Sequence, residues 1–239
     1  MFPVGLILLS VLAVLTFFGV SERFFRKIGV PDWLAFLLLL TFVVGAVVPE
    51  IPIGTSAVIN VGGFIVPAVF LVIVFSVSRR KKEVARILLA SLAVASVTVT
   101  ARMLLRPESG GLFLAAMVIT GVLGGIAAYL AGGTRLATLS GAVGGIMLGD
   151  IANNLIFHYA FGAGVALGSR GVFDSIIIAA VLGVVLLEIV EAIKRAASEK
   201  SLSSSVLNTE AAEDARLEKS WEEAAEEEEF KDYFENDAD

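Results

Sequence analysis

The sequence predicts an all-α membrane protein: a polytopic bundle of about seven transmembrane helices, followed by an acidic cytoplasmic C-terminal helix and tail. Hydrophobic residues make up 57% of the 239 residues and the mean hydropathy is +0.87, whereas soluble domains are usually about 45 to 50% apolar. Several uncharged stretches approach or exceed the roughly 20 residues that a helix needs to cross a bilayer. Together these observations predict a lipid bilayer as the main environment of the chain.

The expected spans follow the apolar stretches, and charged residues inside them are confined to a few acidic ones in the last two. The fourth stretch is short, but Arg86 and Arg102 can extend their charged ends toward the interfaces. The first stretch is expected to be a retained helix, because no basic residue precedes it and no clear cleavage site follows, as a signal peptide would require. The seven stretches are 1–21, 33–49, 51–78, 87–101, 109–134, 136–159 and 172–193.

Charge divides the chain into a transmembrane domain, 1–197, and an acidic cytoplasmic linker and tail, 198–239. Residues 199–239 hold 15 acidic and 4 basic residues, a net charge of −11, so the rest of the chain carries +5. A Ser-rich linker, 201–205, precedes an expected helix at about 209–229. This helix is expected either to be solvated or to dock on basic loops or on a cytoplasmic partner.

Basic residues give the expected helices an orientation. With alternating spans, three of them, Arg102, Arg106 and Arg170, fall on one side. The positive-inside rule places the larger group in the cytoplasm, so the N-terminus is expected outside and the C-terminus inside a multi-pass cell-membrane protein. The larger group is Arg23, Arg26, Lys27, Arg79, Arg80, Lys81, Lys82, Arg86, Arg135, Lys194 and Arg195.

Residue usage excludes several kinds of site. The chain has no cysteine, so disulfides, thiolate nucleophiles and cysteine metal sites are excluded. His158 is the single histidine, which makes a histidine-based metal site improbable. No metal, no cofactor and no nucleic-acid partner are therefore expected.

Two aspartates are the candidates for chemistry. Asp150 lies within the sixth expected span and Asp174 in the first turn of the seventh. An acidic residue at membrane depth costs about 2.5 to 3.5 kcal/mol on insertion scales, so it needs a partner or a water-filled cavity. At about 1.5 Å per residue both fall near the outer side of the membrane, where they could meet. Asp174 could equally be an N-cap.

Polar residues and glycines surround these aspartates. Asn153, Asn154 and His158 follow Asp150 at i+3, i+4 and i+8, which predicts a polar stripe on one helix face. The stripe could line a binding site or form hydrogen bonds to a neighbouring helix. Two glycine sets at four-residue spacing predict close helix packing. These sets are Gly141, Gly145 and Gly149, and Gly121 with Gly125.

The third expected span contains a second polar element. Asn60 precedes a glycine pair, and Pro67 removes a backbone hydrogen bond and is expected to kink the helix. A kink beside Asn60 could line a cavity or serve packing.

These segments carry a resemblance to a prokaryotic membrane family, domain of unknown function family 1614. The resemblance rests on Asn60-Val-Gly-Gly-Phe-Ile-Val-Pro67, on Gly149-Asp150-Ile-Ala-Asn153, and on Gly168 with Gly171-Val-Phe-Asp174-Ser-Ile. It covers most of the membrane part and excludes the tail, and it implies no established activity.

The sequence also distantly resembles intramembrane aspartyl proteases of the presenilin and signal peptide peptidase type. Those enzymes place one aspartate inside a helix and a second in a Gly-x-Gly-Asp element opening the next. Here Gly149-Asp150 precedes Gly171-Val-Phe-Asp174. Neither aspartate has the full Gly-x-Gly-Asp spacing, and the proline-alanine-leucine element is missing from the end of the chain.

Three functions stay open at this point. An aspartyl intramembrane peptidase would use Asp150 and Asp174 as a catalytic pair that shares a proton, with a membrane protein or peptide as substrate. An ion-coupled transporter or channel would present the same acidic and amide oxygens to a proton, a cation or a polar solute. A non-catalytic scaffold would recruit a cytoplasmic partner through the acidic tail.

Overall fold

A computed structural model describes most of the chain from residue 40 to residue 199. The first expected span and most of the second, the Ser-rich linker and the tail helix lie almost entirely outside the described residues. A short helical stretch, 40–45, belongs to the second expected span. The described residues are 7, 10, 11, 40–45, 47–54, 56–78, 80–105, 110–168, 171–199, 216 and 221.

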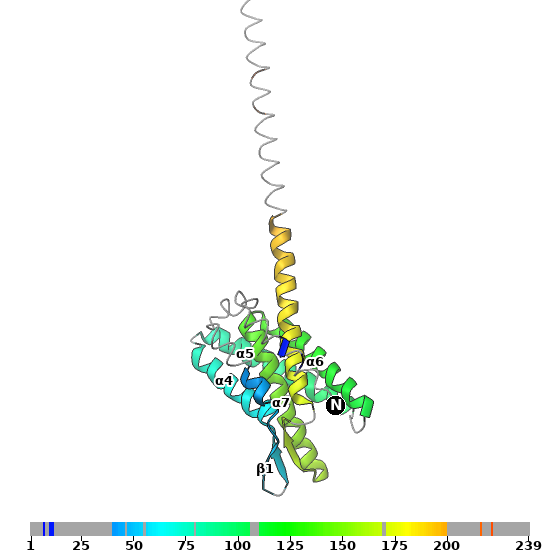
Figure 1. Ribbon diagram of the computed structural model, residues 1–239. Helices are drawn as coiled ribbons and strands as arrows, with labels where there is room; N and C mark the ends of the chain where they lie inside the picture. Colours follow the sequence, from blue (N-terminus) through cyan, green and yellow to red (C-terminus); the bar gives the residue numbers. More distant parts are fainter. Residues whose placement is uncertain are drawn as a thin grey trace, which may run out of the picture. The chain divides into compact units, whose positions relative to one another are not determined.

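The described part is mostly helical, and four of its helices are long and apolar enough to cross a membrane. These are α5 (Lys81–Leu105), α6 (Gly110–Gly132), α7 (Arg135–Phe161) and a last helix, Val172–Glu199 (Figure 1). They correspond to the fourth to seventh expected spans, and α5 extends beyond both arginines that bound the short apolar stretch. A bilayer environment is therefore supported, and within the described residues four of the seven expected spans are helices long enough to cross it.

The third expected span is shorter than predicted. Its first part forms two strands, β1 (Ile51–Ile53) and β2 (Ala57–Ile59), and the helical part is a π-helical turn, η1 (Val61–Ile65), followed by α4 (Val66–Val77). The prediction that 51–78 is one span was wrong because a run of apolar, β-branched residues satisfies both a strand and a helix. Pro67 occupies the first turn of α4, where its missing N–H costs little.

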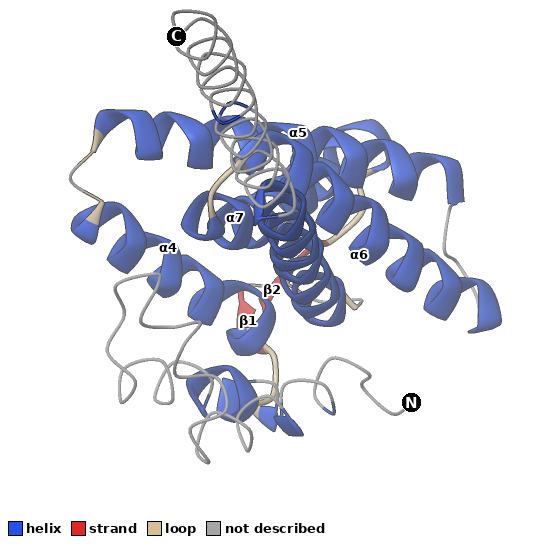
Figure 2. Cartoon of the chain, turned by 90° about the horizontal axis from the view of Figure 1, so that it is seen from above, coloured by secondary structure: helices blue, strands red, loops and turns tan. Residues whose placement is uncertain are grey.

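A small sheet departs from the all-α prediction. A third strand, β3 (Val165–Leu167), follows α7, and the strand order is β1-β2-β3. β1 and β2 are antiparallel, with Gly54 at φ +69° in the intervening turn, whereas β2 and β3 are parallel. The sheet therefore joins the segment before α4 to the segment after α7 (Figure 2).

Glycines bring α7 against α5 along most of its length. A Cβ on Gly141 would lie 2.4 Å from the Cβ of Ala90, and a Cβ on Gly145 would lie 2.3 Å from that of Val94. Gly149 faces Thr98 in the same way. Each pair is separated by the same number of residues, so the two helices run parallel. The predicted small-residue packing face is confirmed.

The second glycine set performs the same role for α6 and the last helix. A Cβ on Gly121 would lie 2.8 Å from the side chain of Ile178, and one on Gly125 would lie 2.9 Å from the carbonyl oxygen of Ala179. The helices α5 and α7 thus form one close parallel pair, and α6 with the last helix forms another. α7 is the most buried of the four candidate spans.

Large apolar side chains are exposed on the outer faces of these helices. Leu92 and Leu104 on α5 and Leu130 on α6 each expose more than half of their surface. Exposed residues of this kind on apolar helices match contact with lipid rather than water. The buried face of α7 instead carries many small residues, among them Gly141, Gly145 and Gly149.

Polar and charged side chains connect the beginnings of α5 and α7 and the last helix, at the end of the bundle away from β3. The Thr134 hydroxyl donates to a Glu83 carboxylate oxygen and accepts from the Ala137 N–H, so Thr134 caps α7. Arg135 pairs with Glu188 of the last helix. Within the last helix, Glu191 pairs with Arg195 at 3.2 Å.

The chain divides into two compact units, 1–188 and 189–239. All the elements of the sheet, the helices α4 to α7 and the first part of the last helix belong to the first unit. The division falls within the last helix, before the boundary at 197 that the charge pattern suggests.

Candidate functional site

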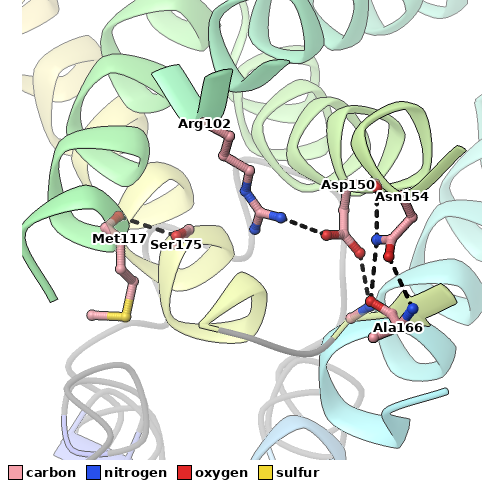
Figure 3. Close-up of polar contacts among 7 residues, drawn as sticks. Arg102, Met117, Asp150, Asn154, Ala166 and Ser175 are labelled. Carbon is pink, nitrogen blue, oxygen red and sulfur yellow. Dashed lines mark hydrogen bonds and ion pairs between the residues drawn. The ribbon is translucent and has the colours of Figure 1, made fainter. Parts of the chain in front are cut away.

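Asp150 is a buried carboxylate paired with Arg102. The Asp150 side chain is 1% exposed, and its Oδ1 lies 2.7 Å from the Nη1 of Arg102. Arg102 is in the last turn of α5, and the glycine packing of α7 brings Asp150 to the same level (Figure 3). A buried charge without a partner costs several kcal/mol. The ion pair gives Asp150 the partner that its depth requires.

The other carboxylate oxygen of Asp150 holds the chain beyond β3. Its Oδ2 accepts a hydrogen bond of 2.8 Å from the Gly168 N–H. Gly168 has φ +75°, and a Cβ on it would lie 2.6 Å from the carbonyl carbon of Gly63 in η1. A side chain at position 168 would therefore be both strained and blocked.

Asn154 binds β3 in place of a neighbouring strand. Its Oδ1 accepts from the Ala166 N–H at 2.9 Å, and its Nδ2 donates to the Ala166 carbonyl at 3.1 Å and to the Asp150 carbonyl at 3.0 Å (Figure 3). The alternate backbone groups of β3 point the other way, since Val165 N–H donates to Ser56 and the Leu167 carbonyl accepts from Asn60. Both edges of β3 are thus occupied.

His158, one helical turn after Asn154, makes a further hydrogen bond to the segment after α7. Its Nδ1 lies 2.8 Å from the Ala163 carbonyl oxygen, which can only accept, so Nδ1–H is the donor. Asp150, Asn154 and His158 therefore all hold the segment that follows α7. Two members of the predicted stripe, Asn154 and His158, thus form hydrogen bonds, and their partner is this segment rather than a helix.

A cavity of about 700 Å³ lies beside the ion pair, at the end of the bundle where α5 and α7 end and α6 begins. Its volume is in the range of small-molecule sites, roughly 300 to 1,000 Å³. Apolar side chains dominate its wall, including Phe113, Met117, Phe157 and Phe161. The polar side chains on the wall are Arg102, Thr120, Asp150, Asn153, Asn154 and Ser175.

Asn153 differs from its neighbours on the wall, Arg102, Asp150 and Asn154, whose side chains form hydrogen bonds. The residue is 3% exposed, and neither its Nδ2 nor its Oδ1 has a hydrogen-bond partner within the described part of the chain. A buried amide without partners is destabilising by about 1 to 3 kcal/mol. Native proteins rarely keep such a group unless it serves a ligand or a water.

Asp174 lies near this end of the bundle but not among the described residues that line the cavity. It is half-buried and is the third residue of the last helix, which begins at Val172. The Gly171 carbonyl accepts the first bond of this helix, from the Ser175 N–H, so Gly171 rather than Asp174 occupies the N-cap position. Asp174 still benefits from the helix dipole in the first turn.

The remaining candidate binding residues support the backbone around β3. The Asn60 side chain caps η1 by accepting from the Gly63 N–H at 2.8 Å, and the backbone N–H of Asn60 donates to the Leu167 carbonyl. Pro67 is fully buried at the start of α4. Gly171 has φ +76°, and a Cβ there would lie 3.0 Å from the sulfur of Met117.

Sequence reasoning treated Arg102 only as a charge at a helix end. A signal for its pairing was present, because Arg102 is a basic residue at the outer end of one span and Asp150 is an acidic residue in the outer half of another. The aromatic and methionine wall had no such signal, since these residues are indistinguishable from lipid-facing ones in an apolar helix.

Comparisons of the chain with family models, with curated proteins and with solved structures each gave no match.

Proposed function

We propose that this protein is a membrane transporter that binds a small solute in the cavity beside Arg102 and Asp150. The observation that carries the proposal is the unpartnered, buried Asn153 amide on the wall of a cavity of ligand size. A binding site of mixed character, mostly apolar with a few convergent polar groups, is typical of small-molecule recognition.

The contacts of Asp150 favour an organic solute over a metal cation as the ligand. Within the described residues no three histidine or acidic side chains are grouped so that they could hold a metal ion. The Asp150 carboxylate is directed at a guanidinium and a backbone N–H. A cation would have to compete with Arg102 for that carboxylate.

The contacts of Asp150 also favour solute binding over an aspartyl peptidase function. An aspartyl peptidase needs two carboxylates that share a proton around a water molecule. Each oxygen of Asp150 instead accepts a hydrogen bond, one from the Arg102 guanidinium and one from the Gly168 N–H. The pair therefore suits a fixed structural and binding role.

The orientation expected from the basic residues complements this proposal. Lys81, Lys82 and Arg135 lie at the beginnings of the parallel helices α5 and α7, and the cavity lies at the other end. By the positive-inside rule the cavity then faces the outer side of the membrane.

Reconstitution of the full chain in liposomes tests the proposal. Uptake is measured for alkali cations, protons, glycerol, L-phenylalanine and 3-phenylpropionate, with empty liposomes as the blank. We expect uptake of at least one organic solute that falls at least tenfold in Asn153→Leu. Flux equal to the blank for every probe would refute transport, and Asp150-dependent cleavage of a membrane-spanning reporter peptide would replace it with the peptidase function.

A further inference from the structure

We infer that the cavity takes a carboxylate on an apolar body, with the carboxylate on Arg102 and Asn153 and the body against the Phe113, Met117, Phe157 and Phe161 side chains. This inference rests on the proposed function and names the class of its solute. The inference depends on which polar groups of the cavity wall already have hydrogen-bond partners in the protein and which do not.

Two polar side chains of the wall, Asn154 and Ser175, are already engaged by the backbone. Both hydrogens of the Asn154 amide are donated to backbone carbonyls, and its oxygen accepts from Ala166. The Ser175 hydroxyl donates to the Met117 carbonyl at 3.1 Å, which ties α6 to the last helix (Figure 3). These groups fix the wall rather than offer donors to a ligand.

The capacity that remains consists mainly of donors. Arg102 has five N–H groups, and the contact to Asp150 is made through Nη1 alone. Asn153 adds two amide hydrogens and one acceptor oxygen, so donors still outnumber acceptors. A ligand group rich in acceptors matches them, and a carboxylate matches the planar fork of a guanidinium best.

The surrounding wall selects what the carboxylate is attached to. Three aromatic rings and a thioether line the cavity beside the polar patch. Aromatic and methionine side chains bury apolar area without demanding hydrogen bonds. A highly polar body, such as a sugar, would leave its hydroxyl groups unpaired against this wall.

Asp150 competes with the bound carboxylate for the same guanidinium. Its negative charge lies on the guanidinium at 2.7 Å, so it opposes a second anion while it orients Arg102. Removal of that charge in Asp150→Asn is therefore expected to strengthen carboxylate binding, whereas it would weaken binding of a cation.

Binding of three matched probes to the full chain in nanodiscs tests the class. The probes are 3-phenylpropionate, its neutral amide 3-phenylpropionamide, and the cation 2-phenylethylammonium. We expect the carboxylate to bind about tenfold more tightly than the amide, because hydrogen bonds to a charged group are worth about twice those to a neutral one. Asp150→Asn should widen this preference, and Arg102→Lys should reduce it, since lysine keeps the charge but loses the fork.

Asn153→Leu separates a binding role from a structural one. Leucine is close in volume and removes the unpartnered amide, so the variant should have a higher melting temperature than the natural chain and weaker carboxylate binding. A lower melting temperature would mean that the amide is engaged structurally, and it would overturn the inference.

The experiments distinguish failure of the carboxylate inference from failure of the proposed transport function. Equal binding of carboxylate and amide, or stronger binding of the cation, refutes the carboxylate inference. If another solute is then carried in an Asn153-dependent manner, the proposed transport function stands without it. If no probe binds and no solute is carried, both the carboxylate inference and the transport function are refuted.

Discussion

Asn153 and Asn154 are adjacent in α7, yet one amide has no hydrogen-bond partner within the described residues and the other has all of its hydrogens engaged. Consecutive helical residues point about 100° apart, so Asn154 meets β3 while Asn153 turns away from it. Both line the cavity. The pair divides the polar face of α7 into a structural part and a part available to a ligand.

The structural part gives the first prediction, on the hydrogen bonds that hold β3. Asn154→Leu removes the partners of the Ala166 N–H and carbonyl, so amide exchange at Ala166 should accelerate markedly. The Val165 N–H, which donates to Ser56 on the opposite edge, serves as the internal reference and should change less. Unchanged protection at Ala166 would contradict the described contact. Hydrogen exchange in detergent micelles provides the measurement.

The ion pair gives a second prediction. Arg102→Met leaves Asp150 buried without its partner, and we expect the free energy of unfolding to fall by about 3 to 5 kcal/mol. The double variant Arg102→Met with Asp150→Asn removes both charges and should be less destabilised than Arg102→Met alone. Reversible unfolding in mixed micelles compares the two. Strictly additive losses would show that the two side chains are not coupled.

Glycine packing gives a third prediction with a matched control. In Gly145→Ala the new methyl group would lie 2.3 Å from the Val94 Cβ and 2.7 Å from the Ser91 carbonyl oxygen, so α5 and α7 must separate. We expect a loss of about 1 to 3 kcal/mol. Gly124→Ala adds a methyl group at 3.5 Å from its neighbours, an ordinary contact, and should leave stability unchanged or slightly higher. Equal melting temperatures for the two variants would count against the packing argument.

The helices of the described part were largely predictable because their signals are local. Apolar length and flanking charge located α5, α6, α7 and the last helix, and four-residue glycine spacing identified their packing faces. The strand region was not predictable in the same way, because β1 and β2 together span fewer than ten residues and the pairing of β2 with β3 joins segments about 100 residues apart. Hydropathy does not report such long-range pairing.

The candidate site was predictable only in its residue types. An aspartate at membrane depth indicated that a partner was needed, but which of several arginines supplied it depended on the register of α5 against α7. The unpartnered state of Asn153 is likewise a property of packing. Sequence gave equal reasons to expect a role for Asn153 and for Asn154, and only their contacts distinguish them.

Backbone strain at Gly168 gives a fourth prediction. Gly168→Ala and Gly162→Ala both place a side chain at positive φ, +75° and +67°, which costs about 1 to 2 kcal/mol for a non-glycine residue. Gly162 has nothing within 4 Å of the new methyl group, whereas Gly168 meets η1. Gly168→Ala should therefore be more destabilising than Gly162→Ala by about 1 kcal/mol or more, because overpacking adds to the backbone strain. Thermal unfolding of both variants measures the difference.

The orientation of the bundle gives the last prediction, and the absence of cysteine makes it simple to test. Lys82→Cys places a thiol at the start of α5, on the basic end, and Phe161→Cys places one at the end of α7, where the residue is 74% exposed. By the positive-inside rule the Phe161→Cys thiol should react with a membrane-impermeant maleimide on intact cells, and the Lys82→Cys thiol only after permeabilisation. The reverse pattern would turn the cavity toward the cytoplasm. The solute would then be taken from inside the cell, so this experiment also sets the direction in which transport should be assayed.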